Sequence, residues 1–293
     1  MSKRIAIITI NYNTEDLLEK LINCLMEQNY RDWKLIIVNN SPDNIEIEKV
    51  IKKFEDERIL LTGINQNLGY SKGNNLGFKY ALDKKLISSD DIVLFTNEDI
   101  IIEDKGFLDK ALNNMEHYKC GFLGPKIINN DGSYMFPHLK EAGYLKCLLH
   151  MGNNGKVDNF FGINKRLRKI NEPLEVFLLN GACFFSRVND FVRIGMFDIN
   201  TFIYYEEELI FRRARREGVK VIYNPGVTVF HEHSASVKKS FSIINKKKFV
   251  YDAELYFLTK ILNVNSFFKL VFKIERFMEF LILRILLTFK VSG

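Results

Sequence analysis

The stretch Asp91-Ile92-Val93-Leu94-Phe95-Thr96-Asn97-Glu98-Asp99 decides the fold of this chain. Its apolar run from 92 to 95 predicts a strand that is buried on both faces. Polar side chains follow at once, at the carboxyl end of the strand, where open α/β sheets bind their ligands. Carboxylates there suit a hard divalent cation, and such a cation suits the phosphates of a nucleotide. The plain alternative is a strand-to-helix turn in which Asp99 caps the next helix.

Strand and helix patterns alternate before this stretch. Residues 5–10 and 33–38 have the pattern of buried strands, and the apolar residues of 17–25 recur at the helical spacing of three and four. A helix near 45–54 and a strand near 59–61 follow. This order predicts an α/β domain with a Rossmann-like, mostly parallel sheet that is flanked by helices.

The composition fits one large domain or a domain with an appendage, because the chain has 293 residues and 47% of them are hydrophobic. The N-terminus leads directly into a predicted strand, so we expect no signal peptide and a cytoplasmic protein.

The cysteines are widely spaced and form no C-x-x-C pair, which indicates reduced thiols rather than a disulfide framework or a zinc site. They are Cys24, Cys120, Cys147 and Cys183.

The net charge of +6 belongs to the C-terminal end of the chain. From Lys238 onward there are eleven basic and four acidic residues, which leaves 31 basic against 32 acidic in the rest. A nearly neutral main part argues against a nucleic-acid partner, whereas the basic tail suits a surface partner. We therefore expect an α/β domain over 1–237 and a basic amphipathic helical tail over 238–293.

The tail is predicted to form two helices, over 246–260 and 266–290. In the second, four basic residues fall on one stripe at helical spacing: Lys269, Lys273, Arg276 and Arg284. Charges interrupt the apolar residues too often for a membrane span. A basic amphipathic helix of this kind can lie in the interface of a bilayer, which would place the protein at the cytoplasmic face of the membrane. The alternative is a helix that packs on the domain or on a partner subunit.

Two polar segments are candidates for ligand contacts. Glycine and asparagine crowd residues 65–77, which predicts a loop that runs into a helix and lets a ligand approach the backbone. A Gly-rich turn without a ligand is the alternative. Residues 138–172 have no regular pattern and carry a basic cluster at 165–169, as expected of a lid or an acceptor-contacting loop.

Three glutamates, residues 206–208, open a predicted helix that continues with arginines and stops at Gly218. Complementing the helix dipole would be a sufficient reason for this arrangement. However, the aromatic residues of 202–205 would place the carboxylates beside an apolar wall, which raises their proton affinity and suits a general base. Small residues at 180–182 interrupt another apolar run, which suggests a close approach to the backbone there.

Two strands are predicted at 219–223 and 227–230, and the second leads into His231. A lone histidine at a strand end is more often a satisfied polar residue than a ligand. Here two histidines and two serines stand together within 231–236, which favours a metal or phosphate contact.

In their order along the chain, these segments resemble the inverting nucleotide-sugar glycosyltransferases of family two, which have a GT-A fold. The similarity is greatest to the bacterial rhamnosyltransferase-like branch that builds surface polysaccharides. It spans about residues 5 to 236. The matching segments are Ile10-Asn11-Tyr12-Asn13, Val38-Asn39-Asn40-Ser41, Asn67-Leu68-Gly69-Tyr70, Gly73-Asn74-Asn75-Leu76-Gly77, Asn97-Glu98-Asp99, Gly124-Pro125-Lys126, Leu179-Asn180-Gly181-Ala182, the helix start from Tyr204, and His231.

The resemblance implies roles for single residues. Glu207 would be the general base, with Glu206 as the alternate. A divalent metal, Mn or Mg, would be held by Asp99, Asn97 and His231. The contacts to the nucleotide sugar would come from Asn11, Tyr12, Asn13, Asn39, Asn40, Gly69, Lys72, Asn75, Asn97, Glu98 and Arg213, of which the last could also pair with the glutamates.

The implied reaction moves a sugar from dTDP-rhamnose or a UDP-sugar to a glycan or lipid-linked acceptor. It is a single displacement with inversion, in which the metal acts as a Lewis acid on the leaving diphosphate and the glutamate takes the proton of the acceptor hydroxyl. The sequence is also compatible with an oligomer.

The chain departs from the family pattern in three places. Asn39 stands where the second strand usually ends in aspartate, and Asn97 replaces the first aspartate of the D-x-D motif. The run Glu206-Glu207-Glu208-Leu209 replaces an alternation of acidic and apolar residues. These departures leave open a degenerate transferase that binds a nucleotide sugar without catalysis. An oxidoreductase is disfavoured because no Gly-x-Gly-x-x-Gly follows the first strand.

Overall fold

The computed structural model describes residues 3–43, 45–141, 143–144, 169–232 and 242–291. Most of the segment predicted as a lid, including the basic residues 165–168, lies outside the described residues, as does the expected domain boundary at 237/238.

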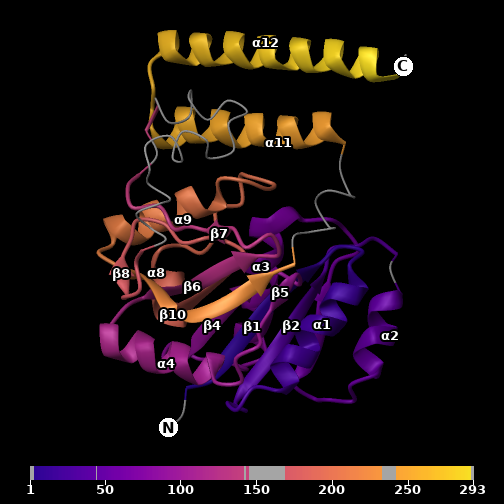
Figure 1. Cartoon of the computed structure of the whole chain (residues 1–293), viewed down its shortest axis with the longest axis vertical. Coiled ribbons are helices and arrows are strands. Elements are labelled where there is room, and N and C mark those ends of the chain that lie inside the picture. Colours follow the sequence, from indigo (N-terminus) through magenta and orange to yellow (C-terminus); the bar gives the residue numbers. More distant parts are fainter. Residues whose placement is uncertain (1–2, 44, 142, 145–168, 233–241, 292–293) are drawn as a thin grey trace.

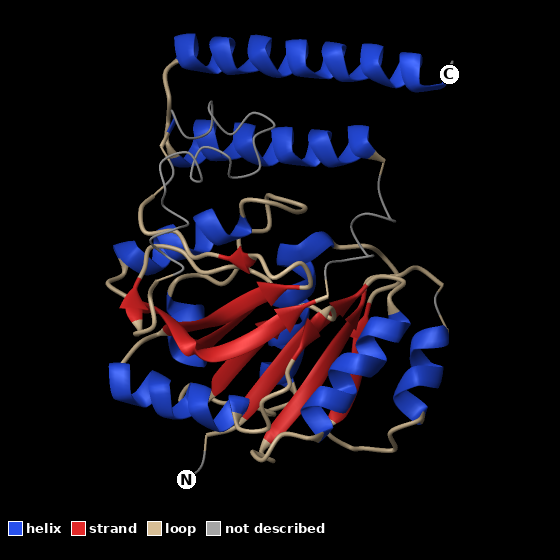
Figure 2. Ribbon diagram, viewed as in Figure 1, coloured by secondary structure: helices blue, strands red, loops and turns tan. Residues whose placement is uncertain are grey.

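One mixed sheet runs through the centre of the main domain (Figure 2). Its strand order is β3-β2-β1-β4-β9-β6-β10-β5. The first four strands in this order are parallel, and β9 enters antiparallel between β4 and β6. The strands are β1 (Ile5–Asn11), β2 (Trp33–Asn39), β3 (Ile59–Gly63), β4 (Ile92–Thr96), β5 (Ile100–Ile101), β6 (Phe122–Asn129), β7 (Tyr134–Met135), β8 (Leu174–Glu175), β9 (Cys183–Arg187) and β10 (Val221–His231). The predicted α/β class with a mostly parallel sheet is confirmed.

Helices cover both faces of the sheet because its central strands are apolar on both sides. Along β1, Ile5 and Ile7 join one buried cluster, whereas Ala6 and Ile8 join the other. The first cluster is completed by α1 (Glu15–Met26), α2 (Glu46–Lys52) and α4 (Phe107–Tyr118). The second is completed by α3 (Gly69–Asp83), α8 (Val188–Arg193) and α9 (Glu206–Arg216). Alternating side chains on buried strands thus give a three-layer domain.

The glycine-rich segment 65–77 is more helical than the sequence suggests. Helix α3 begins at Gly69, so most of the predicted loop is its first turns. A Cβ at Gly77 would lie 2.8 Å from Ile8 and 2.9 Å from Val38 side-chain atoms, and one at Gly73 would lie 2.8 Å from Ile10. These two glycines therefore let α3 pack closely on β1 and β2, and the prediction of a ligand loop there is wrong in its extent.

The last long strand also differs from expectation. The two strands predicted at 219–223 and 227–230 form one strand, β10, whose register against β6 shifts between Asn224 and Thr228. Pro225 and Gly226 lie in this shift, and proline cannot donate a ladder hydrogen bond. A bulge of this kind interrupts the pairing without ending the strand.

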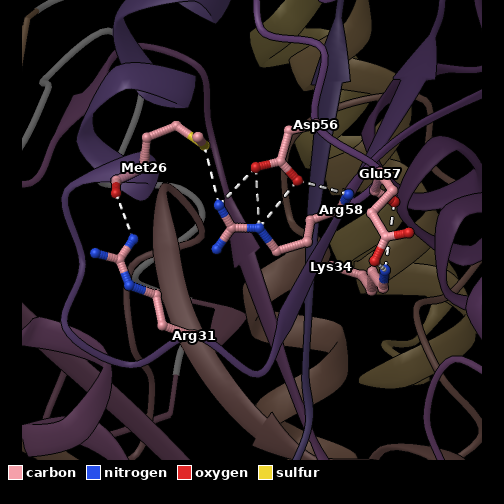
Figure 3. A network of polar contacts seen from close by, with 6 residues as sticks. All are labelled: Met26, Arg31, Lys34, Asp56, Glu57 and Arg58. Atoms are coloured by element: carbon pink, nitrogen blue, oxygen red, sulfur yellow. Dashed lines mark hydrogen bonds and ion pairs between the residues drawn. The ribbon is translucent and has the colours of Figure 1, made fainter.

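A cluster of polar side chains lies at the amino-terminal ends of β2 and β3 (Figure 3). The Arg58 guanidinium binds Asp56, with Nη2 2.6 Å from Oδ2, and lies 4.0 Å over the ring of Trp33. Lys34 Nζ donates to the Glu57 carbonyl at 3.3 Å. This edge is the end of the sheet opposite to the ends of β1, β2 and β4 at which the predicted site residues stand.

The tail forms the two predicted helices, α11 (Ile243–Tyr256) and α12 (Ser266–Val291), joined through a π-helical turn, η1 (Phe257–Ile261). In Figure 1, α12 runs back over α11 on the outer side of the molecule. Phe257, Leu258 and Phe272 of the tail pack with Leu209 of α9. Within the described ranges, no helix is long and apolar enough to cross a membrane.

One residue of the predicted basic stripe is not on the surface. Arg276 is 4% exposed and pairs with Glu254 and Glu279. The prediction of a four-residue basic face is therefore wrong at Arg276, because a buried carboxylate from α11 binds it. Lys273 and Arg284 are exposed, and Lys269 is half-buried.

Candidate active site

A cavity of about 840 Å³ lies at the carboxyl ends of β1, β2 and β4. Its opposite wall comes from the first turn of α9 and from helices α11 and α12. The predicted site residues that line it are Tyr12, Asn40, Gly69, Asn97, Glu98, Asp99, Glu206, Glu207 and His231. The structure thus brings the acidic strand end and the glutamate helix to one hollow, while their individual roles stay predictions.

Asp99 and His231 meet because two short stretches of backbone pair. Ile100 of β5 lies opposite His231 of β10 in an antiparallel register, which places the residue before Ile100 beside the imidazole. Asp99 Oδ1 lies 3.2 Å from His231 Nε2, and both side chains are buried. His231 Nδ1 lies 3.2 Å from Asn129 Oδ1, and Asn129 Nδ2 donates to Ser133. This orientation of the amide assigns the ring proton to Nδ1 and turns Nε2 towards Asp99.

These two side chains fit a divalent cation. Asp99 Oδ1 is buried and accepts no hydrogen bond from the described residues. A neutral imidazole would present a lone pair to this oxygen, so a proton or a cation is needed between them. The described part of the chain holds no cluster of three or more histidine, cysteine or acidic side chains in metal-binding range. Two protein donors suit Mn or Mg, which commonly takes its other ligands from water and substrate phosphates.

Glu98 is buried at the strand-end side of the cavity and has protein hydrogen-bond donors. It accepts hydrogen bonds from Asn11 Nδ2 at 2.8 Å and from the Thr14 hydroxyl. Burial raises the pKa of Glu98 to about 8, although these two donors oppose the rise. The carboxyl group ties the loop after β1 to the loop after β4, so it supports the side of the cavity that the strand ends form.

Glu207 lies against the backbone at Gly181. Its Oε1 accepts a hydrogen bond from the Gly181 N–H at 3.0 Å, and a Cβ at position 181 would lie only 2.5 Å from that oxygen. The small residues in the apolar run therefore do mark a close approach, as the sequence predicts. Burial raises the pKa of Glu207, and the two backbone N–H groups that face it oppose the rise.

Glu206 and the residues before it have an unusual environment. Burial and the neighbouring Glu207 raise the pKa of Glu206 well above its ordinary value. Its Oε2 is buried without a hydrogen-bond partner among the residues that the structure describes. Tyr204 and Tyr205 both have positive φ, 76° and 67°. Consecutive left-handed aromatic residues are strained, and such strain persists only where the surroundings hold it.

The side of the cavity beside α3 is shaped by Gly69. Its φ is 72°, and a Cβ there would lie 2.1 Å from the Phe202 carbonyl oxygen. Asn40 Nδ2 donates to the Gly69 carbonyl at 3.2 Å, and the Tyr70 hydroxyl donates to the Gly181 carbonyl at 2.6 Å. The start of α3 is therefore tied both to the end of β2 and to the backbone that holds Glu207.

The remaining predicted contacts do not line the cavity. Asn39 Oδ1 accepts from the Ser41 N–H, and Asn13 donates its N–H to the Ser41 hydroxyl. Asn11 is buried on Glu98, and Lys72 is exposed on α3. These residues shape loops or lie outside the hollow, so their predicted contacts with a nucleotide remain untested.

Asn75 and Arg213 have structural partners instead of the predicted ones. Asn75 binds the backbone of Phe197 through both ends of its amide, at 2.9 and 3.1 Å. Arg213 donates to the carbonyl oxygens of Gly195 and Met196, so its guanidinium fixes the turn after α8. The prediction that Arg213 pairs with the glutamates is therefore not what the structure shows.

Several lining residues lie outside the predicted site. Tyr70, Asn180 and Gly181 stand in the segments that carry the family resemblance, and sequence could have added them. The tail residues Lys246, Tyr251, Glu254 and Arg276 also line the cavity. Their local sequence signals only a helix, so no pattern in the tail predicted this position.

Comparisons with known proteins agree with this geometry. The family described as glycosyl transferase family 2 matches residues 6–194. The chain is 25% identical over 250 residues to N-acetylglucosaminyl-diphospho-decaprenol L-rhamnosyltransferase of Mycobacterium tuberculosis, covering 80% of this chain and 78% of that protein. It is 23% identical over 231 residues to rhamnosyltransferase WbbL of Escherichia coli, covering 77% of this chain and 82% of that protein.

Among solved structures, the fold matches that of mannosyltransferase PcManGT from Pyrobaculum calidifontis, determined in complex with GDP-Man and Mn2+. The TM-score is 0.57 at 13% identity, and the match covers 91% of this chain and 66% of that chain, just under two thirds of its length. At this identity the likeness shows the fold alone, and the predicted GT-A fold is confirmed.

Proposed function

Because this chain belongs to glycosyl transferase family 2, we propose that it moves a sugar from a nucleotide diphosphate donor to an acceptor hydroxyl with inversion at the anomeric carbon. The observation that carries the proposal is the arrangement of one cavity. The half-buried Glu207 stands on its α9 wall with one oxygen bound to the Gly181 N–H, and an acid–imidazole pair, Asp99 and His231, stands at the strand ends.

Glu207 is the proposed general base. As the acceptor oxygen attacks the anomeric carbon, its proton passes to Glu207 and the bond from that carbon to the donor diphosphate breaks. The Gly181 N–H fixes one oxygen of the carboxylate, which leaves Oε2 to take the proton. The raised pKa makes Glu207 a stronger base than a solvated glutamate, which favours proton transfer near neutral pH.

We propose Asp99 and His231 as the protein ligands of a divalent metal, with Asn97 nearby. When bound there, Mn or Mg would neutralise charge on the leaving diphosphate. Support comes from the buried Oδ1 of Asp99, which accepts no hydrogen bond from the described residues and faces His231 Nε2 at 3.2 Å. Asn129 orients the imidazole through Nδ1, the usual arrangement for a metal-binding histidine.

The donor is proposed to be dTDP-rhamnose first and a UDP-sugar next, and the acceptor a glycan or lipid-linked saccharide of surface polysaccharide synthesis. Support comes from the two relatives described above, which are both named as rhamnosyltransferases, one of them with diphospho-decaprenol in its name. The transferase domain is proposed to extend over residues 1–237 and the appended tail over 238–293.

We further propose that α12 contacts the membrane that carries such an acceptor. Its exposed large apolar residues form one continuous helical face: Phe267, Leu270, Ile274, Phe277, Met278, Leu281, Ile282 and Ile285. Exposed Lys273 and Arg284 stand along one margin of this face. An apolar face with a basic margin suits the interface of a bilayer that contains anionic lipids.

The test is a panel of nucleotide sugars added to the purified protein, with and without Mn. The true donor should raise the apparent melting temperature, since ligands that bind the native state stabilise it by mass action. In the presence of a lipid-linked saccharide, that donor should release its nucleotide. Tight donor binding with no release, with any acceptor or with water, would contradict catalysis and favour a degenerate binding protein.

A further inference from the structure

The C-terminal helices build part of the cavity wall as well as the outer face of the molecule. From α11, the residues Lys246, Lys247, Tyr251 and Glu254 line the hollow, and from α12 Arg276 and Glu279 do so. The same hollow is lined by Glu206 and Glu207 of α9. The tail and the proposed base therefore face the same hollow, and the role of the tail there is separate from any contact with a membrane.

A buried ion pair joins the two tail helices at this wall. Glu254 is 2% exposed and Arg276 is 4% exposed. Both guanidinium contacts go to one oxygen, with Nε 3.0 Å and Nη2 2.8 Å from Oε2 of Glu254. Arg276 also binds Glu279 at 3.0 Å, and Glu279 pairs with Lys247. The remaining oxygen of Glu254, Oε1, accepts a hydrogen bond from the Tyr205 hydroxyl at 3.3 Å.

Such a buried pair does little for stability on balance, since desolvation offsets much of the attraction and well-packed apolar residues can often replace it. What the pair does here is hold an oriented acceptor for Tyr205. This residue has a φ of 67° and directly precedes Glu206 at the start of α9. Its ring packs against Phe257 of the tail at 5.2 Å between centroids. The strained entry into α9 is thus held by tail residues from two sides.

We propose that Tyr205, Glu254 and Arg276 form a positioning chain, through which the tail holds the first turn of α9 with its carboxylates towards the cavity. These three residues fix the position of the glutamates and transfer no proton. The expected loss of kcat rests on the proposed function of Glu207. The expected change in the position of the first turn of α9 does not.

The first test compares Tyr205→Phe with Tyr256→Phe. Tyr256 is a matched control, because its hydroxyl also ties the tail to the main domain, through Asp198 at 3.0 Å and Asn200 at 3.1 Å, but it does not line the cavity. Tyr205→Phe is expected to lower kcat roughly 10- to 100-fold with little change in the donor KM, since small misplacements of reacting groups have effects of this size. Tyr256→Phe is expected to keep kcat. Equal kcat values in the two variants would overturn the proposal.

A double-mutant cycle excludes a direct contact between Tyr205 and the substrate. If the chain acts as a unit, Glu254→Gln combined with Tyr205→Phe lowers kcat no further than the worse single change. Multiplicative losses would mean that Tyr205 acts without Glu254 and would overturn the proposal. Arg276→Lys keeps the charge and should retain more of the wild-type kcat than Arg276→Met. The comparison holds if the two variants have the same melting temperature.

A third measurement needs no activity. Carbon-13 NMR titration of the glutamate carboxyl groups, assigned with Glu206→Gln and Glu207→Gln, follows the first turn of α9 directly. Tyr205→Phe should move the raised pKa values of Glu206 and Glu207 towards the ordinary glutamate value, whereas Tyr256→Phe should not. Unchanged titration in Tyr205→Phe would overturn the positioning chain even in an active enzyme. Absence of sugar transfer by the wild type would instead overturn the proposed function, and the titration would still decide this inference.

Discussion

The Gly181 N–H donates to Oε1 of Glu207 at 3.0 Å, and this contact exists only because position 181 has no side chain. A methyl group there would lie 2.5 Å from the same oxygen and would displace the carboxylate. Backbone in the segment before β9 therefore sets the position of a side chain on α9.

Gly181→Ala should reduce kcat by roughly 10-fold or more while the protein stays folded, because the carboxylate must move away from the backbone donor. Steady-state kinetics with the identified donor would measure this. Gly106→Ala is the matched control, since a Cβ there would be in ordinary contact, 3.4 Å from Asp104 Oδ1 and 3.7 Å from Lys110, and position 106 does not line the cavity. Full activity in Gly181→Ala would mean that the position of Glu207 is unimportant for turnover.

Glu207→Ala should lower kcat about 10²- to 10⁴-fold, the range that general base catalysis supplies, and leave nucleotide binding nearly intact. Calorimetric titration of the nucleotide alongside turnover separates the two effects. Glu217→Ala is the control, because this exposed glutamate follows the last turn of α9 and does not line the cavity. If Glu207→Ala turns over normally while Glu206→Ala does not, the base is Glu206.

The rate should fall on the acid side at a pH above the ordinary glutamate pKa of 4.5. Burial raises the pKa of Glu207, and only its ionised form can accept the proton, so activity is lost as the pH decreases through that raised pKa. A pH profile of kcat measures the position of this limb. A limb at or below 4.5 would contradict a buried base.

Chelation with EDTA should abolish activity, and Mn or Mg should restore it. Asn129→Ala should weaken Mn binding about 10- to 100-fold, because the imidazole of His231 loses the partner that orients it. Electron paramagnetic resonance of Mn in the presence of nucleotide would report the affinity. Asp83→Asn, an exposed change outside the cavity, should bind Mn like the wild type. Full activity in EDTA would exclude a metal at Asp99 and His231.

The outward face of α12 should bind anionic vesicles and detach at high salt. Replacing Lys273 and Arg284 by Gln should weaken binding by about 1 kcal/mol for each charge, roughly fivefold each. Lys49→Gln with Lys52→Gln on α2, which Figure 1 shows far from α12, removes the same charge as a control. Vesicle sedimentation measures both. No binding by the wild type would point to a second protein chain as the cover of this face, and equal binding of all variants would contradict the role given to Lys273 and Arg284.

Local pattern was sufficient to predict the alternating strands and helices, because buried parallel strands and amphipathic helices each have their own periodicity. It also placed Asp99 and His231 at strand ends. It could not predict that β9 enters antiparallel between β4 and β6, since that pairing joins residues distant in sequence. The local pattern also could not distinguish a glycine that leaves room for a ligand from one, such as Gly77, that leaves room for a neighbouring strand.

The tail shows the same limit more strongly. Helical spacing puts Arg276 near Lys273 and Lys269, and only its partner Glu254, 22 residues earlier, reveals that it faces inward. Similarly, Asn75 looked like a ligand contact beside Gly73, but its amide is used by the Phe197 backbone. In both cases a polar residue in a suggestive segment has a structural partner that comes from elsewhere in the chain.

Helices α11 and α12 supply one wall of the hollow. A truncation that removes every residue from Ile243 onward would therefore open the hollow and delete the apolar outer face at the same time. An inactive truncated enzyme would thus give no information on anchoring. Anchoring and turnover can be separated only by single substitutions that leave the inner side of α12 intact, such as Phe277→Ser on the outward side.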